Sequence, residues 1–349
     1  MNNQPLVCIC IPNYNNEKTI SETLDSLVNQ TYKNIIIKIF DNASTDNSMK
    51  ILKEYEAKYT HIQVFQNGTN IGGEGNFNKC IQNLEGEYSA LYHSDDVYEP
   101  TIVEEQVKFL LENEECVAVS TDMNLIDENS KKLYKTPLKE FFENKEFITI
   151  DNQIQMLKKV LEIGNFIACP SVMMKTEIYK NKIKKYDVEN FKTAADFELW
   201  FRVLEFGKFV TILKPLINYR QSSNSYSFRT RLRTEESDGI KVVKHFYIIL
   251  ENELPKEYKR KLDFYIFKDN VIRILNQILV DQKDYNLKLN IFDLNVLGES
   301  LKTNKNLKFL LLGIIVKFIR HIKLPKYLRE KLIYARFNIK GSNLWVGKK

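Results

Sequence analysis

The stretch YSALYHSDD, residues 88–96, decides the predicted fold, because an apolar run of strand length ends there at two adjacent carboxylates. In an open α/β sheet, ligands bind in the crevice beyond the carboxyl ends of the strands. We therefore expect Asp95 and Asp96 to border that crevice, where their oxygens could hold a divalent cation, Mg²⁺ or Mn²⁺, against a diphosphate. A structural alternative is that Asp96 caps a helix that begins near Glu99.

The residues before this stretch repeat a pattern of strand followed by helix. Apolar runs typical of buried parallel strands occur at residues 6–11, 35–40 and 62–65. Apolar residues at helical spacing, or a glycine-rich loop leading into a helix, separate these runs. The alternation predicts an α/β fold with a mostly parallel, doubly wound sheet.

The pattern after residue 100 is mixed. It predicts a strand at residues 117–121, a hairpin within 125–134, a helix at 151–163 and an extended segment at 165–174. Beyond residue 228 it predicts helices alone, at 240–250, 258–279 and 307–322. We therefore divide the chain into an α/β domain, residues 1–228, and a helical C-terminal region, residues 229–349.

Four short motifs in this order resemble those of the family 2 glycosyltransferases, which have a GT-A-like fold that binds nucleotide sugars. They are PNYN (12–15) with Glu17, DNASTD (41–46), NIG (70–72) with Asn78, and SDD (94–96). The resemblance implies that Pro12 and Tyr14 border a uracil, that Asp41 contacts the uridine, and that Asp95 binds the metal. It also assigns Glu17, Asn70 and Ser94 to the donor site.

Each motif also has a plainer interpretation. Asp41 ends a predicted strand and could accept hydrogen bonds from a base or a ribose, but an Asx-turn or a helix cap needs the same residue type. The glycines of the loop at 68–75 match neither the Walker pattern nor the dinucleotide fingerprint, so a phosphate cradle and an ordinary turn both stay open.

A candidate catalytic base lies further along, in the segment TAADFELWFR, residues 193–202, which opens a predicted helix. The segment resembles the Glu-Asp motif of the family, with Asp196 in the place of the catalytic aspartate and Ala195 in the place of the glutamate before it. The alternative role for Asp196 is to cap the helix.

Two positions differ from the family pattern. His93 stands where the metal motif has its first aspartate, and Ser222 stands where many relatives carry a histidine, two residues after Arg220. His93 could itself bind the metal or contact the ribose, or it could be an ordinary polar residue at the end of a strand.

The composition is that of a globular protein, with 44% hydrophobic and 28% charged residues. The five cysteines are scattered without zinc-ligand spacing, which favours a reducing compartment. Residues 1–5 lack the basic and apolar pattern of a signal peptide, and no apolar run approaches the roughly 20 residues of a membrane-spanning helix. We expect a cytoplasmic protein.

The charge is distributed unevenly along the chain. Residues 305–349 hold 12 Lys and Arg and one acid, a net charge of +11, which leaves 39 basic and 44 acidic residues, a net charge of −5, in residues 1–304. Such a basic region suggests an anionic partner, either a membrane surface or nucleic acid. Because no aromatic–basic pattern of a nucleic-acid module is present, we expect no nucleic acid partner. The apolar segment 309–316 could lie in a membrane interface, or it could be a buried helix that closes the domain.

Together these observations predict an inverting glycosyltransferase. It would move a sugar from a nucleotide-diphosphate donor, most simply a UDP-sugar, to a hydroxyl of a glycan or lipid-linked acceptor in surface polysaccharide or glycan assembly, at the inner face of the cell membrane. One alternative is a nucleotidyltransferase on a related fold, although the loop at residues 13–18 lacks the glycines usual there. The other is a non-catalytic protein that binds an anionic surface.

Overall fold

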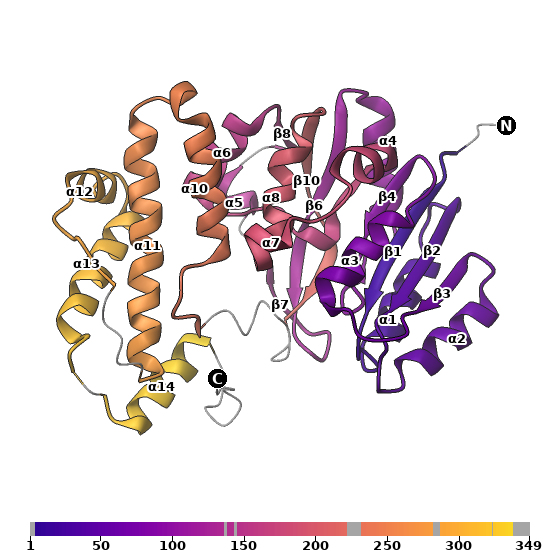
Figure 1. Ribbon diagram of the computed structural model, residues 1–349, viewed down its shortest axis with the longest axis horizontal. Coiled ribbons are helices and arrows are strands. Elements are labelled where there is room, and N and C mark those ends of the chain that lie inside the picture. The colour runs from indigo at the N-terminus through magenta and orange to yellow at the C-terminus, as the bar shows by residue number, and fades with distance from the viewer. Residues whose placement is uncertain are drawn as a thin grey trace. The chain divides into compact units, whose positions relative to one another are not determined.

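The computed structural model describes residues 4–135, 138–142, 145–221, 232–281, 287–322 and 324–337. The chain divides into two compact units, the first made of Met1–Met156 and Asn165–Gln221 and the second of Leu157–Gly164 and Ser222–Lys349. Figure 1 shows strands and helices in the first unit and helices in the second. The predicted boundary at residue 228 lies outside the described residues, so that exact division stays a prediction.

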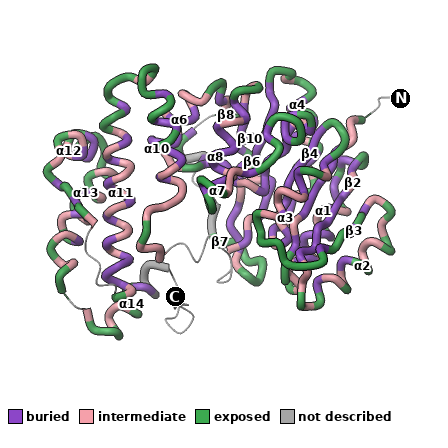
Figure 2. Tube along the Cα trace, in the orientation of Figure 1, coloured by how far each residue is buried: buried purple, intermediate pink, exposed green. Residues whose placement is uncertain are grey.

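The first half of the α/β unit is a parallel sheet. Its strands are β1 (Val7–Asn13), β2 (Ile35–Asp41), β3 (Ile62–Gln66) and β4 (Tyr88–Leu91), and they lie side by side in the order β3-β2-β1-β4. The crossovers are helices α1 (Ile20–Val28), α2 (Ser48–Lys58) and α3 (Gly72–Gln82). Because helices shield β1, β2 and β4, their side chains are buried almost without interruption, as Figure 2 shows, whereas β3, at the edge of the sheet, has exposed residues between its buried ones.

The second half of the sheet is mixed, as the sequence predicts. Strand β9 (Met173–Lys175) runs antiparallel between β4 and β6 (Cys116–Ile126), and β6 lies parallel to β10 (Lys208–Arg220). Strands β5 (Val97–Tyr98) and β8 (Phe147–Ile150) pair antiparallel with β10, and β7 (Lys132–Lys135) completes the predicted hairpin with β6. Helices α4 (Ile102–Glu112), α5 (Leu138–Phe141) and α6 (Gln153–Ile163) accompany them. The predicted α/β class is confirmed.

The segment 165–174, which we expected to be extended throughout, contains a 3₁₀ turn at Cys169–Ser171 before β9 begins. The hydroxyl of Ser171 holds this turn against β6, because it donates to the carbonyl of Thr121 at 3.2 Å and accepts the N–H of Thr121. The turn therefore brings Cys169 to the sheet in a fixed position.

The helical unit contains α10 (Asp238–Leu250), α11 (Glu257–Leu279), α12 (Leu294–Ser300), α13 (Asn304–Ile319) and α14 (Lys326–Phe337). The predicted helices correspond to α10, α11 and α13. Its core lies between α11 and α13, where Val271 and Val316 are fully buried. A Cβ at Gly313 would lie 2.6 Å from the ring of Phe267, so the glycine lets the two helices approach closely. None of the described helices combines the length and the apolar character needed to cross a membrane.

Candidate active site

His93, Asp95 and Asp96 form a group just beyond the end of β4. Each offers one ligand atom, and these atoms lie within 4.8 Å of one another. Asp96 is buried, and its Oδ1 accepts a hydrogen bond of 2.7 Å from the backbone N–H of Arg220. Its other oxygen, Oδ2, and the Nε2 of His93 are buried and have no hydrogen-bond partner among the described residues.

The electrostatics of this group fit a divalent cation. Burial raises the pKa of Asp96 well above its ordinary value, the charge of Asp95 raises it further, and Arg220 opposes both. Burial likewise lowers the pKa of His93, which keeps the imidazole neutral and able to donate its lone pair. Carboxylate oxygens are the ligands that Mg²⁺ and Mn²⁺ prefer. A cation bound here would give the orphaned Oδ2 of Asp96 a partner, so the residues present fit the predicted metal.

The proposed capping role of Asp96 is wrong. Asp96 precedes β5, and α4 begins only at Ile102, with Thr101 as its N-cap. The end of β4, the group of His93, Asp95 and Asp96, which we call the metal-type group, and the short strand β5 thus follow each other directly along the chain. The side chain of His93 is 25% exposed, so it is partly withdrawn from solvent, and its contact with a metal or a ribose stays a prediction.

Arg220, at the end of β10, holds the backbone of this group in place. Its guanidinium donates to the carbonyl of Asp95 at 2.7 Å and to the carboxylate of Glu22 on α1 at 2.5 Å. It also donates to the β6–β7 turn, at the carbonyl of Asp127 (3.1 Å) and the hydroxyl of Ser130 (2.9 Å). One buried side chain therefore joins three separate segments around Asp95 and Asp96, a role that sequence reasoning missed.

The residues predicted to bind the nucleotide lie at the ends of β1 and β2. Asp41 is completely buried, its Oδ1 accepts from the side-chain amide of Asn13 at 2.9 Å, and its Oδ2 accepts from the backbone N–H of Ser44 at 3.0 Å. Asp41 thus accepts the N–H three residues on, one residue further than in an Asx-turn, and so closes the loop after β2 by a local side-chain to backbone bond. Pro12 is half-buried in β1 and Tyr14, two residues on, is 44% exposed, so an aromatic face is available there.

Asn42 organises the loop between β3 and α3. Its Oδ1 accepts from the amide of Asn67 and from the backbone N–H of Ile71, each at 3.0 Å. Its Nδ2 donates to Asn70 Oδ1 at 2.9 Å and to the carbonyl of Gly72 at 3.0 Å. Asn70 is thus engaged within the loop while it remains exposed, and this network, which the sequence did not reveal, fixes the loop beside β2.

Glu17 and Ser94 have structural partners as well. Glu17 accepts from the backbone N–H and the side-chain amide of Asn47, at 2.9 and 2.8 Å, at the start of α2. The Ser94 hydroxyl accepts from the amide of Asn16 at 2.6 Å, which ties the loop after β1 to the metal-type group. The structure explains both residues as braces between loops, and their contact with a donor stays a prediction.

Asp196 lies in the first turn of α8 (Ala195–Val203), and the N-cap position belongs to Ala194. Its carboxylate nevertheless accepts from backbone N–H groups of that turn, so the predicted capping takes place from within the first turn of the helix and not from the N-cap position. Burial raises the pKa of Asp196 to about 6, although backbone N–H groups and the Cys169 thiol donate to its carboxylate and limit the shift. A carboxylate with this pKa is ionised at neutral pH and is a stronger base than an ordinary aspartate.

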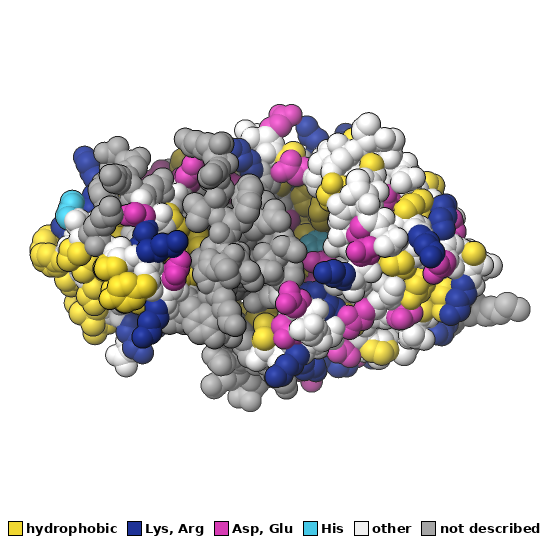
Figure 3. Space-filling model, turned by 90° about the horizontal axis from the view of Figure 1, so that it is seen from below, with side chains coloured by type: hydrophobic (Ala, Val, Ile, Leu, Met, Phe, Trp, Pro, Cys, Tyr) yellow, Lys and Arg dark blue, Asp and Glu magenta, His cyan; other side chains and the backbone are white. Residues whose placement is uncertain are grey.

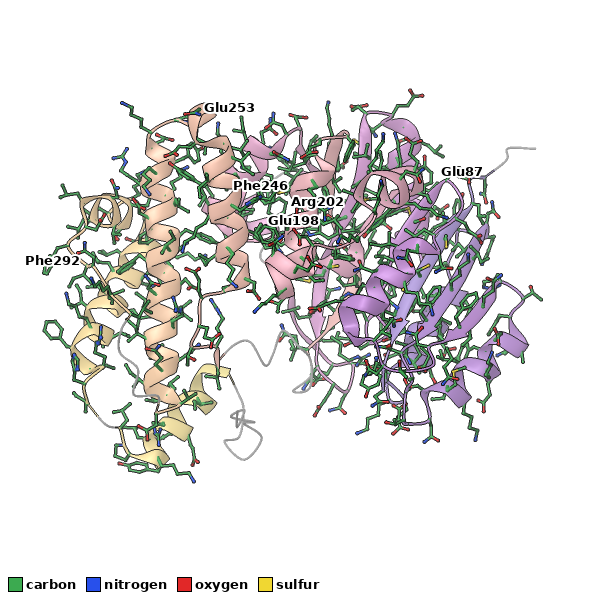
Figure 4. The ribbon with its side chains drawn as sticks, viewed as in Figure 1. Glu87, Glu198, Arg202, Phe246, Glu253 and Phe292 are labelled. Atoms are coloured by element: carbon green, nitrogen blue, oxygen red, sulfur yellow. The ribbon has the colours of Figure 1, made fainter. Side chains whose placement is uncertain are left out.

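Helix α8 is held firmly behind Asp196. Trp200 is fully buried, and Glu198 pairs with Arg202 at 2.7 Å one turn later, as Figure 4 shows. Arg202 also donates to the carbonyls of Ile183 and Lys185, at 3.3 and 3.0 Å. The helix therefore cannot shift without breaking buried contacts, and the position of Asp196 is fixed.

A line of side chains connects Asp196 with the metal-type group. The ring of His93 meets that of Phe77 edge-on at 5.6 Å, and Phe77 meets Tyr186 in the same way at 5.6 Å. The hydroxyl of Tyr186 lies 3.9 Å from the Cys169 sulfur. Burial raises the pKa of the Cys169 thiol, the charges of Asp196 and Asp96 raise it further, and the thiol donates a hydrogen bond to the carboxylate of Asp196.

The structure thus brings the predicted base and the predicted metal ligands into one region. Sequence reasoning missed Phe77 and Tyr186, because single aromatic residues in a helix and a loop carry no signal of their own. Asn78 was noticed in the sequence, and its Oδ1 accepts the N–H of Tyr186 at 2.9 Å, which positions that aromatic residue. Ser222 lies outside the described residues.

Comparisons with known proteins identify the class. The model of the family described as glycosyl transferase family 2 matches residues 8–180. The uncharacterized glycosyltransferase RT0329 of Rickettsia typhi is 30% identical over 227 residues, which are 63% of this chain and 67% of that protein. The putative teichuronic acid biosynthesis glycosyltransferase TuaG of Bacillus subtilis is 28% identical over 225 residues, 64% of this chain and 82% of that one.

A solved structure supports the fold. The crystal structure of S. aureus TarS 1-349 in complex with UDP matches with a TM-score of 0.53 at 18% identity, and the match covers 95% of this chain and 87% of that chain. The sheet and its helices are those of a GT-A-type glycosyltransferase, as the sequence predicts. The chain belongs to glycosyltransferase family 2.

Proposed function

We propose that the chain is an inverting glycosyltransferase that moves a sugar from a nucleotide-diphosphate donor to a hydroxyl of a glycan or lipid-linked acceptor. One observation carries this proposal: a line of contacts through Phe77, Tyr186 and Cys169 leads from the His93–Asp95–Asp96 group to Asp196. An inverting transfer needs a base for the acceptor and, across the anomeric carbon, a site for the departing diphosphate.

In the proposed reaction, the acceptor hydroxyl donates a hydrogen bond to the carboxylate of Asp196. As the acceptor oxygen forms its bond to the anomeric carbon, Asp196 takes the proton, and the bond from that carbon to the diphosphate oxygen breaks with its electron pair on the oxygen. Configuration at the anomeric carbon inverts in this single displacement. A divalent cation held by Asp95 and Asp96, with His93, would when bound neutralise charge on the leaving diphosphate.

We propose UDP as the nucleotide of the donor. The motif around Pro12 and Tyr14 supports this choice, and TarS, a protein of the same fold, has been crystallised with UDP. Tyr14 presents an exposed aromatic face on which a uracil could stack. A direct contact of uridine with Asp41 would require one of its internal hydrogen bonds to break, so for Asp41 we favour shaping of the loop.

We further propose a role in surface polysaccharide assembly, with the enzyme peripheral to the inner face of the cell membrane. The putative role of TuaG in teichuronic acid biosynthesis supports the polysaccharide setting. The basic C-terminal region, with a net charge of +11 over residues 305–349, supports attraction to an anionic membrane.

The test is incubation of the protein with a panel of UDP-sugars and Mn²⁺ or Mg²⁺, followed by measurement of thermal stability and of slow UDP release. We expect at least one UDP-sugar to raise the melting temperature and to release UDP, and the Asp196→Asn variant to keep the first effect and lose the second. Binding without UDP release by the wild-type protein, with or without an acceptor extract, would refute the enzymatic proposal.

A further inference from the structure

Helix α13 has two apolar faces, and only one of them packs inside the helical unit. Leu310, Gly313 and Val316 are buried, toward α11. On the other side, three large apolar residues follow the helix at spacings of four and three, and a fourth lies just after the end of the helix. We call this set the outer seam; its members are Leu311, Ile315, Phe318 and Ile322, which are 52%, 55%, 72% and 56% exposed.

Other apolar side chains extend the exposed surface beside the outer seam. Phe292, before the start of α12, is 75% exposed and lies at the edge of the helical unit in Figure 4. The ammonium of Lys317 lies 5.5 Å from the centroid of the Phe292 ring, so this phenylalanine adjoins α13 next to Phe318. Figure 3 shows hydrophobic side chains gathered over this part of the chain, with lysines and arginines beside them. Apolar surface gathered in this way usually marks an interaction site.

The charges around the outer seam indicate which partner it meets. Helix α13 carries Lys305, Lys308 and Lys317 and no acidic residue, and from residue 305 to 337 the sequence contains one acid, Glu330. An anionic lipid surface complements these cations and also receives the apolar side chains. A second copy of the chain would bring the same lysines face to face, which opposes association.

We propose that the outer seam seats the helical unit on an anionic bilayer, with Leu311, Ile315 and Phe318 at the boundary of headgroups and acyl chains and Lys308 and Lys317 at the lipid phosphates. The proposal deepens the membrane association in the proposed function by naming the surface that makes it. It also locates the contact on one face of the helix, because the other face is taken up by α11.

The first test is co-sedimentation with phosphatidylcholine vesicles, with and without phosphatidylglycerol. We expect binding only to the anionic vesicles, and we expect Leu311→Ser/Ile315→Ser/Phe318→Ser to weaken it at least ~10-fold, since each change removes apolar burial in the interface. The matched control is Ile248→Ser/Ile249→Ser on α10, where the two isoleucines are also exposed, at 71% and 55%. This control should bind as the wild type does, and both variants should keep the wild-type melting temperature.

Charge and depth are tested separately. Lys308→Gln/Lys317→Gln should weaken binding roughly fivefold per lysine at low salt, and added salt should remove the difference. In a Trp345→Phe background, which keeps only the fully buried Trp200, the emission of a Phe318→Trp probe is taken as the difference from the background protein. This difference should shift to the blue and be quenched by brominated acyl chains, whereas that of an Ile248→Trp probe should do neither.

Several results would overturn the proposal. They are equal binding to neutral and anionic vesicles, unchanged binding by the triple serine variant, and a Phe318→Trp probe that stays in water. If the triple variant instead converts a dimer to a monomer in sedimentation equilibrium and binds vesicles normally, the outer seam belongs to a second copy and the proposal fails. The vesicles contain neither sugar donor nor acceptor, so these results are independent of whether the proposed transfer takes place.

Discussion

Asp196→Asn tests catalysis and electrostatics in one variant. The substitution keeps the size of the side chain and an oxygen that accepts the same hydrogen bonds, but it removes the basicity. Transfer should fall at least about 10²-fold, the scale of general-base catalysis, while the affinity for the donor stays nearly unchanged. In the wild type, the rate should fall about tenfold per pH unit below about pH 6, because protonation of Asp196 removes the base.

The same variant should be more stable than the wild type at neutral pH. The pKa of Asp196 is about 6 in the fold and 3.8 ordinarily, so the fold favours the protonated form. That favourable contribution is complete below pH 3.8 and is lost as the pH rises through about 6. The difference between these two pKa values corresponds to a free energy of unfolding of about 3 kcal/mol at order of magnitude. Asparagine carries no charge, so the variant should gain up to this amount above pH 7 and nearly nothing near pH 4.

Urea unfolding at acidic and alkaline pH measures the free energy of unfolding. The rate of UDP release from the donor measures catalysis, either with an acceptor present or with water as the acceptor. Glu189→Gln, which removes an exposed acid on the short helix α7 (Val188–Phe191), is the control and should change neither. Near-normal transfer by Asp196→Asn would exclude Asp196 as the base. A variant that is less stable than the wild type at pH 8 would show that the buried carboxylate carries no unfavourable charge.

Three further predictions concern the framework of the site. Asp95→Ala should abolish Mn²⁺-dependent UDP binding in calorimetry, and wild-type transfer that persists unchanged in EDTA would refute the metal site. Arg220→Gln should lower the free energy of unfolding by about 1–3 kcal/mol, because the carbonyls of Asp95 and Asp127 lose their charged donor; Arg220→Lys should recover part of this, and a fully stable Gln variant would contradict the argument. Asn42→Ala should cost about 1–3 kcal/mol and speed hydrogen exchange in residues 67–72, whereas the exposed control Thr69→Ala should not.

The parallel half of the fold was predictable from sequence because helices cover those strands. The apolar runs of β1 and β2 are therefore nearly continuous, and all four strands end at a polar segment that marks the edge of the sheet. Strands β5 and β9 have two and three residues, too few for any periodicity to appear. Strand β10 is long, but its register shifts around Pro215, which interrupts the pattern that would have revealed it.

The contacts that shape the candidate site were beyond reach of sequence reasoning for a different reason. Arg220 and Glu22 are separated by 198 positions, and nothing local to either residue indicates the other. Motif positions such as Asp41 and Asp196 could be named because their residue types suit a chemical role at the end of a strand or the start of a helix. Whether such a residue is buried, and which partners it already has, depends on segments that meet only in the folded chain.

Helix α13 shows how the two kinds of information combine. A segment that is apolar on all sides is equally consistent with a protein interior and with a membrane interface, so the sequence left both open. In the structure the two interpretations apply to opposite faces: Leu310 and Val316 take part in the core with α11, while Ile315 and Phe318 remain 55% and 72% exposed. The core of the helical unit therefore accounts for only half of the apolar character of α13. The other half stays exposed among the residues that the structure describes, and the lysines on the same helix are why we propose an anionic bilayer, and not another copy of this protein, as its partner.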